Sequence, residues 1–301
     1  MKKSKLMMII FLTPAIFSYM VIFLYPSIRT SFMSLFRVEN VTDAMSKWQF
    51  VGLDNYQALK ESSLFVQSMK NLVNIWFWGG IIVFVLAIVF SVILTSGVKY
   101  KSFYRAIIYL PNVVSAVAMG TMWMQYVYSS RYGLFKEVFE SIGLDKMAAI
   151  QWTSPDMIFI SLLIAYCFGM VGYYMLIFMA AMENIPISFY EAATLAGANV
   201  FQKFYHITLP LLKDVFRTNI VLWTISSVAF FIWSQVFSPL NPEPGTVTPM
   251  VYMYQMVFGN NMVVTDRNVG AGAAVGVILT LIVVVMFVIT TRLLKDEEYE
   301  Y

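Results

Sequence analysis

The sequence predicts an all-α membrane protein with six transmembrane helices. Hydrophobic residues make up 59% of its 301 residues and charged residues only 12%, whereas soluble domains are roughly 45–50% apolar and about 25% charged. Several apolar stretches reach the roughly 20 residues that cross a bilayer as a helix. Because spanning segments must pair their backbone polar groups internally, each stretch is expected to be helical.

Six such segments form a single predicted transmembrane domain that covers the whole chain, residues 1–301. Polar residues interrupt the third and the fifth segments, and the third also contains Pro111. Gly272 and Gly276, at the start of the sixth, form a G-x-x-x-G pair, which lets helices approach closely in lipid. The predicted segments are residues 6–25, 73–94, 107–126, 157–179, 220–237 and 271–293.

The basic residues orient the bundle, because short loops rich in Lys and Arg stay in the cytoplasm. They cluster before the first segment, after the second and after the sixth, which predicts that both termini are cytoplasmic. The first segment is long and no small-residue cleavage site follows it, so we expect an uncleaved helix. The loops at 26–70, 127–156 and 238–270 are then expected outside. The orienting residues are Lys2, Lys3, Lys5, Lys99, Lys101, Arg105, Arg292 and Lys295.

The sequence shows no catalytic or metal-binding cluster, so we do not expect an enzyme. Cys167 and His206 are the only residues of their types, which excludes an internal disulfide and a zinc site built from Cys and His. Cys167 is expected to be a small packing residue. No G-x-x-x-x-G-K-[ST] phosphate loop occurs in the sequence, and no dense basic patch indicates a nucleic-acid partner.

A cytoplasmic stretch between the fourth and fifth segments has the signals of a short helix with marked ends. Ser188 and Glu191, three residues apart, fit a capping box at its start. Gly197 suits the left-handed position that closes a helix. Pro210 presets the start of the next helix.

This short helix has one apolar face of mostly small residues, Phe189, Ala192, Ala193 and Ala196. A helix of about eight residues is unstable alone in water, so it must dock on something. Two interpretations remain open from these residues alone. The helix is either a connector packed on its own bundle or a helix that fits into a groove on another protein.

The pattern E-A-A-x-x-x-G, followed by nine residues and I-x-L-P, resembles the EAA loop of ABC-importer permeases, which have the type I importer permease fold. In that family the loop is a coupling helix seated in a cleft of the ATPase subunit. The resemblance implies this role for residues 185–198, within a coupling loop at 185–210. It also implies no cofactor in this chain, since ATP and Mg²⁺ are bound by partner ATPase subunits. The residues implied in coupling are Ser188, Glu191, Ala192, Ala193, Gly197, Ile207, Leu209 and Pro210.

Two further stretches are similar to permeases of carbohydrate importers. Residues 50–56 resemble the F-x-G-L-x-N-Y stretch after that family's first helix, and Arg105, Tyr109-Leu110-Pro111, Ser115 and Trp123 resemble its third-helix pattern. The resemblance implies import of a sugar, an oligosaccharide or a related polyol or glycerol phosphate across the bacterial cytoplasmic (inner) membrane. It also implies three kinds of partner: a second, non-identical permease, two ATP-binding subunits and an extracytoplasmic solute-binding protein.

The sequence departs from the family's pattern in two places. Ala196 stands where the family often has Asp just before the loop glycine, which is expected to alter docking on the ATPase slightly. Residues 241–246 replace the family's Gly-Gly-Pro turn after the fifth helix, which bears on how the outer loop contacts a binding protein.

Polar and aromatic residues inside the predicted spans are candidates for a substrate pathway, because sugars offer apolar C–H faces and hydroxyl rims. Trp and Tyr also crowd both membrane interfaces regardless of substrate. We therefore expect Trp76, Trp78 and Trp233, near segment ends, to be interface residues. The pathway candidates are Asn74, Tyr173, Trp223, Ser227 and Gln235.

Three alternatives remain beside the sugar permease. One is a permease of the same superfamily for a solute such as an amino acid, a peptide or phosphate. Another is an ion-coupled secondary carrier, which usually places an Asp or Glu at mid-membrane. None of the six predicted segments has a central carboxylate, which disfavours the carrier. The third, a membrane-embedded enzyme, would need a catalytic cluster.

Overall fold

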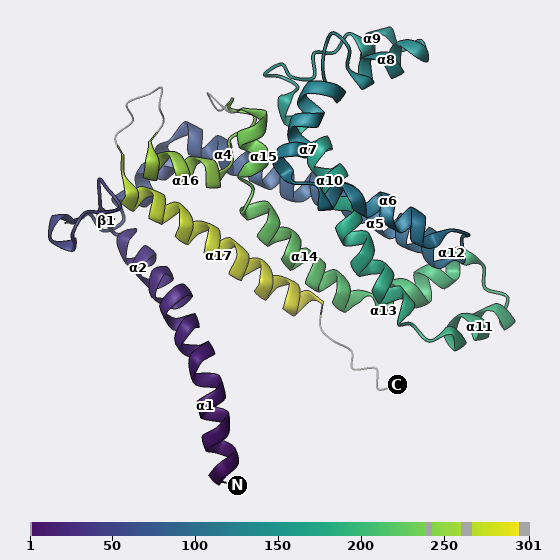
Figure 1. Cartoon of the computed structure of the whole chain (residues 1–301), viewed down its shortest axis with the longest axis horizontal. Helices are drawn as coiled ribbons and strands as arrows, with labels where there is room; N and C mark the ends of the chain where they lie inside the picture. The colour runs from purple at the N-terminus through teal and green to yellow at the C-terminus, as the bar shows by residue number, and fades with distance from the viewer. Residues whose placement is uncertain (1, 239–242, 260–266, 295–301) are drawn as a thin grey trace. The chain divides into compact units, whose positions relative to one another are not determined.

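A computed structural model describes residues 2–238, 243–259 and 267–294 (Figure 1). The described residues are mostly helical, and their one sheet pairs two short antiparallel strands, β1 (Phe36–Arg37) and β2 (Gln49–Phe50). The chain divides into two compact units, which we call the first and the second unit. They are Met1–Val66 with Pro249–Leu281, and Gln67–Thr248 with Ile282–Tyr301.

The first unit begins with one continuous helix that is longer than its predicted span. The prediction ended at residue 25 and placed Pro26 in an outer loop, whereas the helix continues to Met33. Its stretch Ile10–Met33, of 24 residues, is long and apolar enough to cross a membrane. The helix consists of α1 (Lys2–Tyr19), the π-helical turn η1 (Met20–Leu24) and α2 (Tyr25–Met33).

The π-helical turn explains how this helix passes Pro26. The N–H of Tyr25 donates to the carbonyl of Met20, so the turn is wider than an α-helical one. In a regular helix, proline removes one hydrogen bond and its ring clashes with the preceding turn. A wider turn accommodates both effects. The loop after this helix therefore starts after Met33, and the predicted loop start at Pro26 is wrong.

The loop that follows α2 in the first unit is held together by the buried side chain of Asn55, which is 3% exposed. Its Nδ2 donates to the carbonyl oxygens of Ser34 (2.8 Å) and Phe36 (2.9 Å), and its Oδ1 accepts from Nδ2 of Asn268 (3.0 Å). The stretch 50–56 thus has a structural role in this unit. The elements after α2 are the 3₁₀ turn η2 (Met45–Lys47), α3 (Asp54–Glu61), the start of α4 (Ser63–Asn74), α16 (Pro249–Phe258) and most of α17 (Val269–Leu293).

Close packing in the first unit depends on glycines at the start of α17. A Cβ atom on Gly270 would lie 1.8 Å from the carbonyl oxygen of Phe36, and one on Gly272 would lie 2.6 Å from Cγ2 of Val257 in α16. A Cβ on Gly276 would lie 3.7 Å from Sδ of Met253, which is also in α16. The close approach predicted for the G-x-x-x-G pair is therefore confirmed, and α16 is the helix that approaches.

The second unit is built around α10 (Ile158–Glu183), which packs on α5, α6, α14 and α15. Its other elements are the end of α4, η3 (Ile75–Gly79), α5 (Gly80–Thr95), α6 (Lys101–Val113), α7 (Ala116–Met122), η4 (Trp123–Val127), α8 (Leu134–Ser141), α9 (Asp145–Ala148), α11 (Ile187–Leu195), α12 (Val200–Lys203), η5 (Phe204–Thr208), α13 (Leu209–Leu211), α14 (Lys213–Val228), α15 (Ile232–Phe237) and the end of α17. A Cβ on Gly172 of α10 would lie 2.3 Å from the carbonyl oxygen of Ile108. Glycine is therefore what lets α6 approach the central helix.

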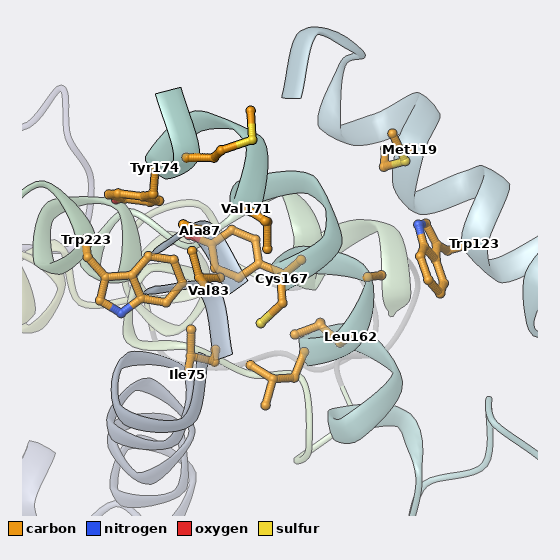
Figure 2. Close-up of a cluster of buried hydrophobic side chains, with 14 of the residues drawn as sticks. Ile75, Val83, Ala87, Met119, Trp123, Leu162, Cys167, Val171, Tyr174 and Trp223 are labelled. Atoms are coloured by element: carbon orange, nitrogen blue, oxygen red, sulfur yellow. The ribbon is translucent and has the colours of Figure 1, made fainter. Parts of the chain in front are cut away.

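The core of the second unit gathers side chains from η3, α5, α10 and α14 (Figure 2). Trp223 of α14 lies there beside Tyr174 and is only 1% exposed. Its Nε1 donates to the carbonyl oxygen of Trp76 in η3 (2.8 Å). Cys167 is buried in the same core, so its predicted role as a packing residue is confirmed.

Two of the six predicted spans are broken, so the count of six is not confirmed. The bend between α6 and the helix that starts with α7 is 97°, and Pro111 lies in the last turn of α6. The fifth predicted span breaks between α14 and α15, where the hydroxyl of Thr248 donates to the carbonyl of Phe230 (2.5 Å). In the part of the chain that the structure describes, four helices could cross a membrane, or five if the bent pair is one span. The four are Ile10–Met33, Ser63–Thr95, Ile158–Glu183 and Val269–Leu293.

We expect Asn55→Ala to destabilise the protein, because the change leaves the carbonyls of Ser34 and Phe36 and the amide of Asn268 without this partner. A buried polar group without a partner costs about 1–3 kcal/mol, so the loss should reach about 2 kcal/mol or more. Thermal unfolding of the detergent-purified protein measures it. Gln57→Ala, at an exposed position of the same helix, is the control. Equal unfolding temperatures for the two variants would contradict this role of Asn55.

Candidate functional site

The predicted coupling loop forms a compact helical segment at one end of α10. The short helix is α11, nine residues long, and it is followed by α12, η5 and α13. Pro210 lies in the first turn of α13, as predicted for the start of a helix. α11 lies at the opposite end of α10 from α8 and α9 (Figure 1). Within the second unit, the loop and the α8–α9 segment therefore mark opposite ends of the central span.

The predicted capping box of Ser188 and Glu191 is wrong. Pro186 occupies the N-cap position of α11 with an extended backbone (φ −57°, ψ 130°), and no side chain makes a capping hydrogen bond there. Because the helix begins at Ile187, Ser188 is the second helical residue and lies too far along the helix to cap it. Both Ser188 and Glu191 are exposed. The carboxylate of Glu191 thus plays no part in starting the helix.

A capping box does exist one helix later, at a place that the sequence reasoning missed. Asn199 Oδ1 accepts from the N–H of Gln202 (2.9 Å), and Gln202 Oε1 accepts from the N–H of Asn199 (2.8 Å). The signal was available, because Asn followed three residues later by Gln is a form of the same pattern. This box starts α12 and so sets the direction in which the chain leaves α11.

Gly197 closes α11 in the left-handed conformation, as predicted, with φ +80°. The N–H of Gly197 donates to the carbonyl of Thr194 (2.9 Å), and the N–H of Ala198 donates to that of Ala193 (2.9 Å). This pair of bonds is the Schellman motif, in which two terminal carbonyls of a helix find partners. No atom lies within 4 Å of a Cβ built on Gly197. A larger residue would therefore be strained by its backbone conformation and not by its neighbours.

Polar contacts tie α11 to the elements that follow it. The hydroxyls of Tyr190 and Thr208 lie 2.9 Å apart, and Nζ of Lys203 donates to Oγ1 of Thr194 (2.7 Å). Thr208 is buried, whereas Thr194 and most of α11 are exposed. The helix is thus held along one side and leaves its other side open.

The open side of the loop carries apolar side chains that are exposed among the described residues. Of the predicted small-residue face, Phe189, Ala192 and Ala196 are exposed and Ala193 is half-buried. Beyond this face, Leu195 is 92% and Phe201 84% exposed. A connector packed on its own bundle would bury such residues, so this arrangement favours docking on another surface. The exposed apolar side chains, which we call the loop surface, are Ile187, Phe189, Leu195, Val200 and Phe201.

The five pathway candidates do not form one cluster. Trp223 and Ser227 are buried in the core of the second unit, at 1% and 0% exposure. Asn74 is exposed, at the end of α4, whereas Tyr173 of α10 and Gln235 of α15 are half-buried. Core packing and the bond to Trp76 therefore account for Trp223 without a substrate.

Asn219 is a buried polar residue that the sequence reasoning missed. It is 0% exposed, and neither its Nδ2 nor its Oδ1 has a hydrogen-bond partner among the described residues. The hydroxyl of Ser227 likewise lacks one there. Asn219, Trp223 and Ser227 are spaced four residues apart on α14, so they share one face of the helix. That spacing was the signal by which the sequence could have grouped them.

Comparisons with known proteins identify relatives of this chain. No protein-family model matches the chain. The arabinooligosaccharides transport system permease protein AraP of Halalkalibacterium halodurans is 30% identical over 288 residues, which cover 94% of this chain and 86% of that protein. The diacetylchitobiose uptake system permease protein NgcF of Streptomyces coelicolor is 27% identical, over 84% of this chain and 74% of its own length.

The fold also matches a solved structure. A chain of a bacterial ABC transporter involved in the import of the acidic polysaccharide alginate superposes with a TM-score of 0.80 at 17% identity, covering 98% of this chain and 97% of that one. Together with its helical spans, this makes the chain a multi-pass membrane protein with an ABC-importer permease fold. With 30% identity to one such permease over nearly its whole length, the chain belongs to the family of ABC transporter permeases that includes these oligosaccharide-uptake proteins.

Proposed function

We propose that this chain is a membrane-spanning subunit of an importer that carries a sugar or an oligosaccharide across the bacterial cytoplasmic membrane. The observation that carries the proposal is the open, apolar surface of α11 on a loop with the EAA pattern. Relatives support the class of substrate, since their names specify arabinooligosaccharides, diacetylchitobiose and starch degradation products. These sugars differ from one another, so the proposal is limited to saccharides as a class.

The loop at 185–210 is the part that receives the energy of ATP hydrolysis. In this proposal the loop surface and the small residues of α11 seat in a groove of an ATPase subunit, which itself binds ATP and Mg²⁺. Burial of apolar side chains such as Leu195 and Phe201 drives the docking. Glu191 is exposed and does not cap the helix, so we assign it a direct polar contact with the ATPase. Ser188, Ile207, Leu209 and Pro210 complete the coupling set.

ATP then acts on the transport pathway only indirectly. Closure of two ATPase subunits moves the docked helices and shifts the permease between inward-open and outward-open states. A ligand shifts such an equilibrium only through its different affinity for the two states, so ATP must favour one arrangement of the docked loop. The pathway itself lies at an interface with a second, non-identical permease.

Asn74, Tyr173 and Gln235 remain our candidates for contact with the sugar, since each has an accessible side chain. Ser227, whose hydroxyl has no hydrogen-bond partner among the described residues, also stays a pathway candidate, and Trp223 is kept as a positioning residue. Trp223 donates to the carbonyl of Trp76, two residues after Asn74, and so fixes the end of α4. The aromatic ring of Tyr173 and the amides of Asn74 and Gln235 suit the apolar and hydroxyl faces of a sugar.

The outer loops face a solute-binding protein in this proposal, and both termini are cytoplasmic. A second structure of an alginate ABC transporter, in complex with alginate pentasaccharide-bound periplasmic protein, matches with a TM-score of 0.78 at 18% identity, which supports a partner of that kind. Of the departure at 241–246, Asn241 and Pro242 lie outside the described residues, as does Lys295 of the predicted basic tail.

We expect Gly197→Val to abolish coupled transport and Gly197→Asn to retain much of it. The left-handed conformation costs a residue with a Cβ about 1–2 kcal/mol and is worst for β-branched side chains, whereas Asn tolerates it. The measurement is uptake of sugar, with sugar-stimulated ATP hydrolysis, by the reconstituted importer. Full coupled activity of Gly197→Val would contradict our account of this loop.

We expect Leu53→Cys to react with an impermeant thiol reagent from outside the cell, and Tyr100→Cys, in the short loop after α5, to react only after the membrane is permeabilised. Both positions are well exposed, at 69% and 79%, and neither belongs to the loop surface, whereas the buried Asn55 is unsuited to labelling. The experiment uses a Cys167→Ala background, which has no other cysteine. The reverse pattern of labelling would invert the proposed topology.

A further inference from the structure

A polar cleft lies in the second unit, where the chain turns from η4 into α8. It has a volume of about 340 Å³, and small-molecule sites measure roughly 300–1,000 Å³. We propose that this cleft binds one sugar residue of a saccharide, at a site separate from the pathway candidates. Most of its lining side chains are polar, namely Gln125, Ser129, Ser130, Arg131, Tyr132 and Thr153.

The backbone of the cleft is fixed by a tight turn that ends at Gly133. The N–H of Gly133 donates to the carbonyl oxygen of Ser129 (2.9 Å). A Cβ atom on Gly133 would lie only 2.3 Å from that same oxygen, so the turn requires glycine. Nζ of Lys136 in α8 also donates to the carbonyl oxygen of Ser130 (3.3 Å). The two residues between Ser130 and Gly133 are therefore held on a set backbone.

One wall of the cleft is Tyr128, whose side chain is buried. Its hydroxyl donates to the carbonyl oxygen of Ser161 in α10 (2.8 Å). Its ring stacks on that of Trp152, with 5.8 Å between the ring centroids, and Trp152 directly precedes the lining residue Thr153. The end of η4 and the segment before α10 are thus joined, and the cleft is formed before a ligand enters it.

The accessible side chains of the cleft suit a sugar residue. Tyr132 is 61% exposed, and its aromatic ring suits the apolar C–H face of a sugar. Arg131 is exposed, and among the described residues no carboxylate forms an ion pair with it. Its guanidinium carries five N–H donors in a fixed fork, which fits two neighbouring hydroxyl oxygens of a sugar. The exposed amide of Gln125 and hydroxyl of Thr153 add further donors and acceptors.

A small polar ligand fits this cleft better than a docked protein does. The core of a protein interface is apolar and depleted of charged residues, whereas this lining is polar and includes a guanidinium. The cleft lies with α8 at the end of α10 opposite to α11 (Figure 1), which in the proposed topology is the outer end, where a saccharide arrives. This placement and the choice of probes rest on the proposed function, whereas binding itself rests on the cleft.

The test is photo-cross-linking to the complete importer in lipid nanodiscs, without its solute-binding protein. The probes are arabinotriose, diacetylchitobiose and maltotriose, each with a diazirine at its reducing end. Labelled peptides are mapped by mass spectrometry. We expect at least one probe to label residues 124–132 or Thr153.

Substitutions in the cleft separate this site from other labelling. Tyr132→Ala should lower the labelling about fivefold, because it removes the ring on which the sugar packs, whereas Tyr132→Phe should retain it. Arg131→Gln should also lower it, because the guanidinium fork is lost. Tyr126→Ala is the matched control and should have no effect, since Tyr126 of η4 is equally exposed, at 62%, and does not line the cleft.

Two results would overturn the proposal. One is labelling of the cleft that Tyr132→Ala leaves unchanged. The other is absence of labelling there by all three probes, and if Tyr132→Ala then weakens binding of sugar-free solute-binding protein, the cleft is a protein-docking surface. ATP-driven uptake of the unmodified sugars, with the solute-binding protein added, is measured on the same importer in vesicles. Uptake without labelling of the cleft overturns this site alone, whereas failure to take up any saccharide counts against the proposed function.

Discussion

A helix in lipid must pair its own backbone polar groups, and the bends of this chain are arranged around that constraint. Where α14 ends, the hydroxyl of Thr248 donates to the carbonyl of Phe230. In the π turn η3, the carbonyl of Trp76 accepts from the indole of Trp223. Side chains from distant segments thus stabilise these two irregular turns, and the bond of Trp223 ties α14 to η3. The loop at 185–210 precedes α14 along the chain. Because α14 is tied to η3, this loop extends from a fixed end of the second unit.

The long spans could be predicted from the sequence, whereas the breaks could not. An uninterrupted apolar run has one stable solution in lipid, a helix, so the spans around α10 and α17 lie close to their predicted bounds. Whether a helix continues past a proline or bends there depends on the surrounding residues. Pro26 lies in a continuous helix directly after a π turn, whereas Pro111 lies just before a bend of 97°. No hydropathy pattern distinguishes these two outcomes, since the difference lies in local hydrogen bonding.

The candidate site, too, could be predicted from the sequence only in part. Gly197 was predictable, because a glycine after a short helical pattern has a single strong backbone preference. The capping box was assigned to the wrong residues, because Pro186 takes the N-cap and leaves Ser188 inside the helix. The pathway residues were harder still, since an aromatic residue in a span looks the same whether it packs or binds. Trp223 proved to be buried, and Asn219, on the same face of α14, had not been singled out.

The central claim is that α11 is the contact through which ATPase subunits drive this permease. Leu195, 92% exposed at the end of that helix, tests it most directly. In inside-out vesicles that contain the complete importer, a Leu195→Cys, Cys167→Ala chain is treated with a short thiol-to-amine cross-linker. The account predicts a cross-linked product with the ATPase subunit whose yield changes when ATP is added. Cross-links confined to the permease itself, with the importer assembled and active, would contradict it.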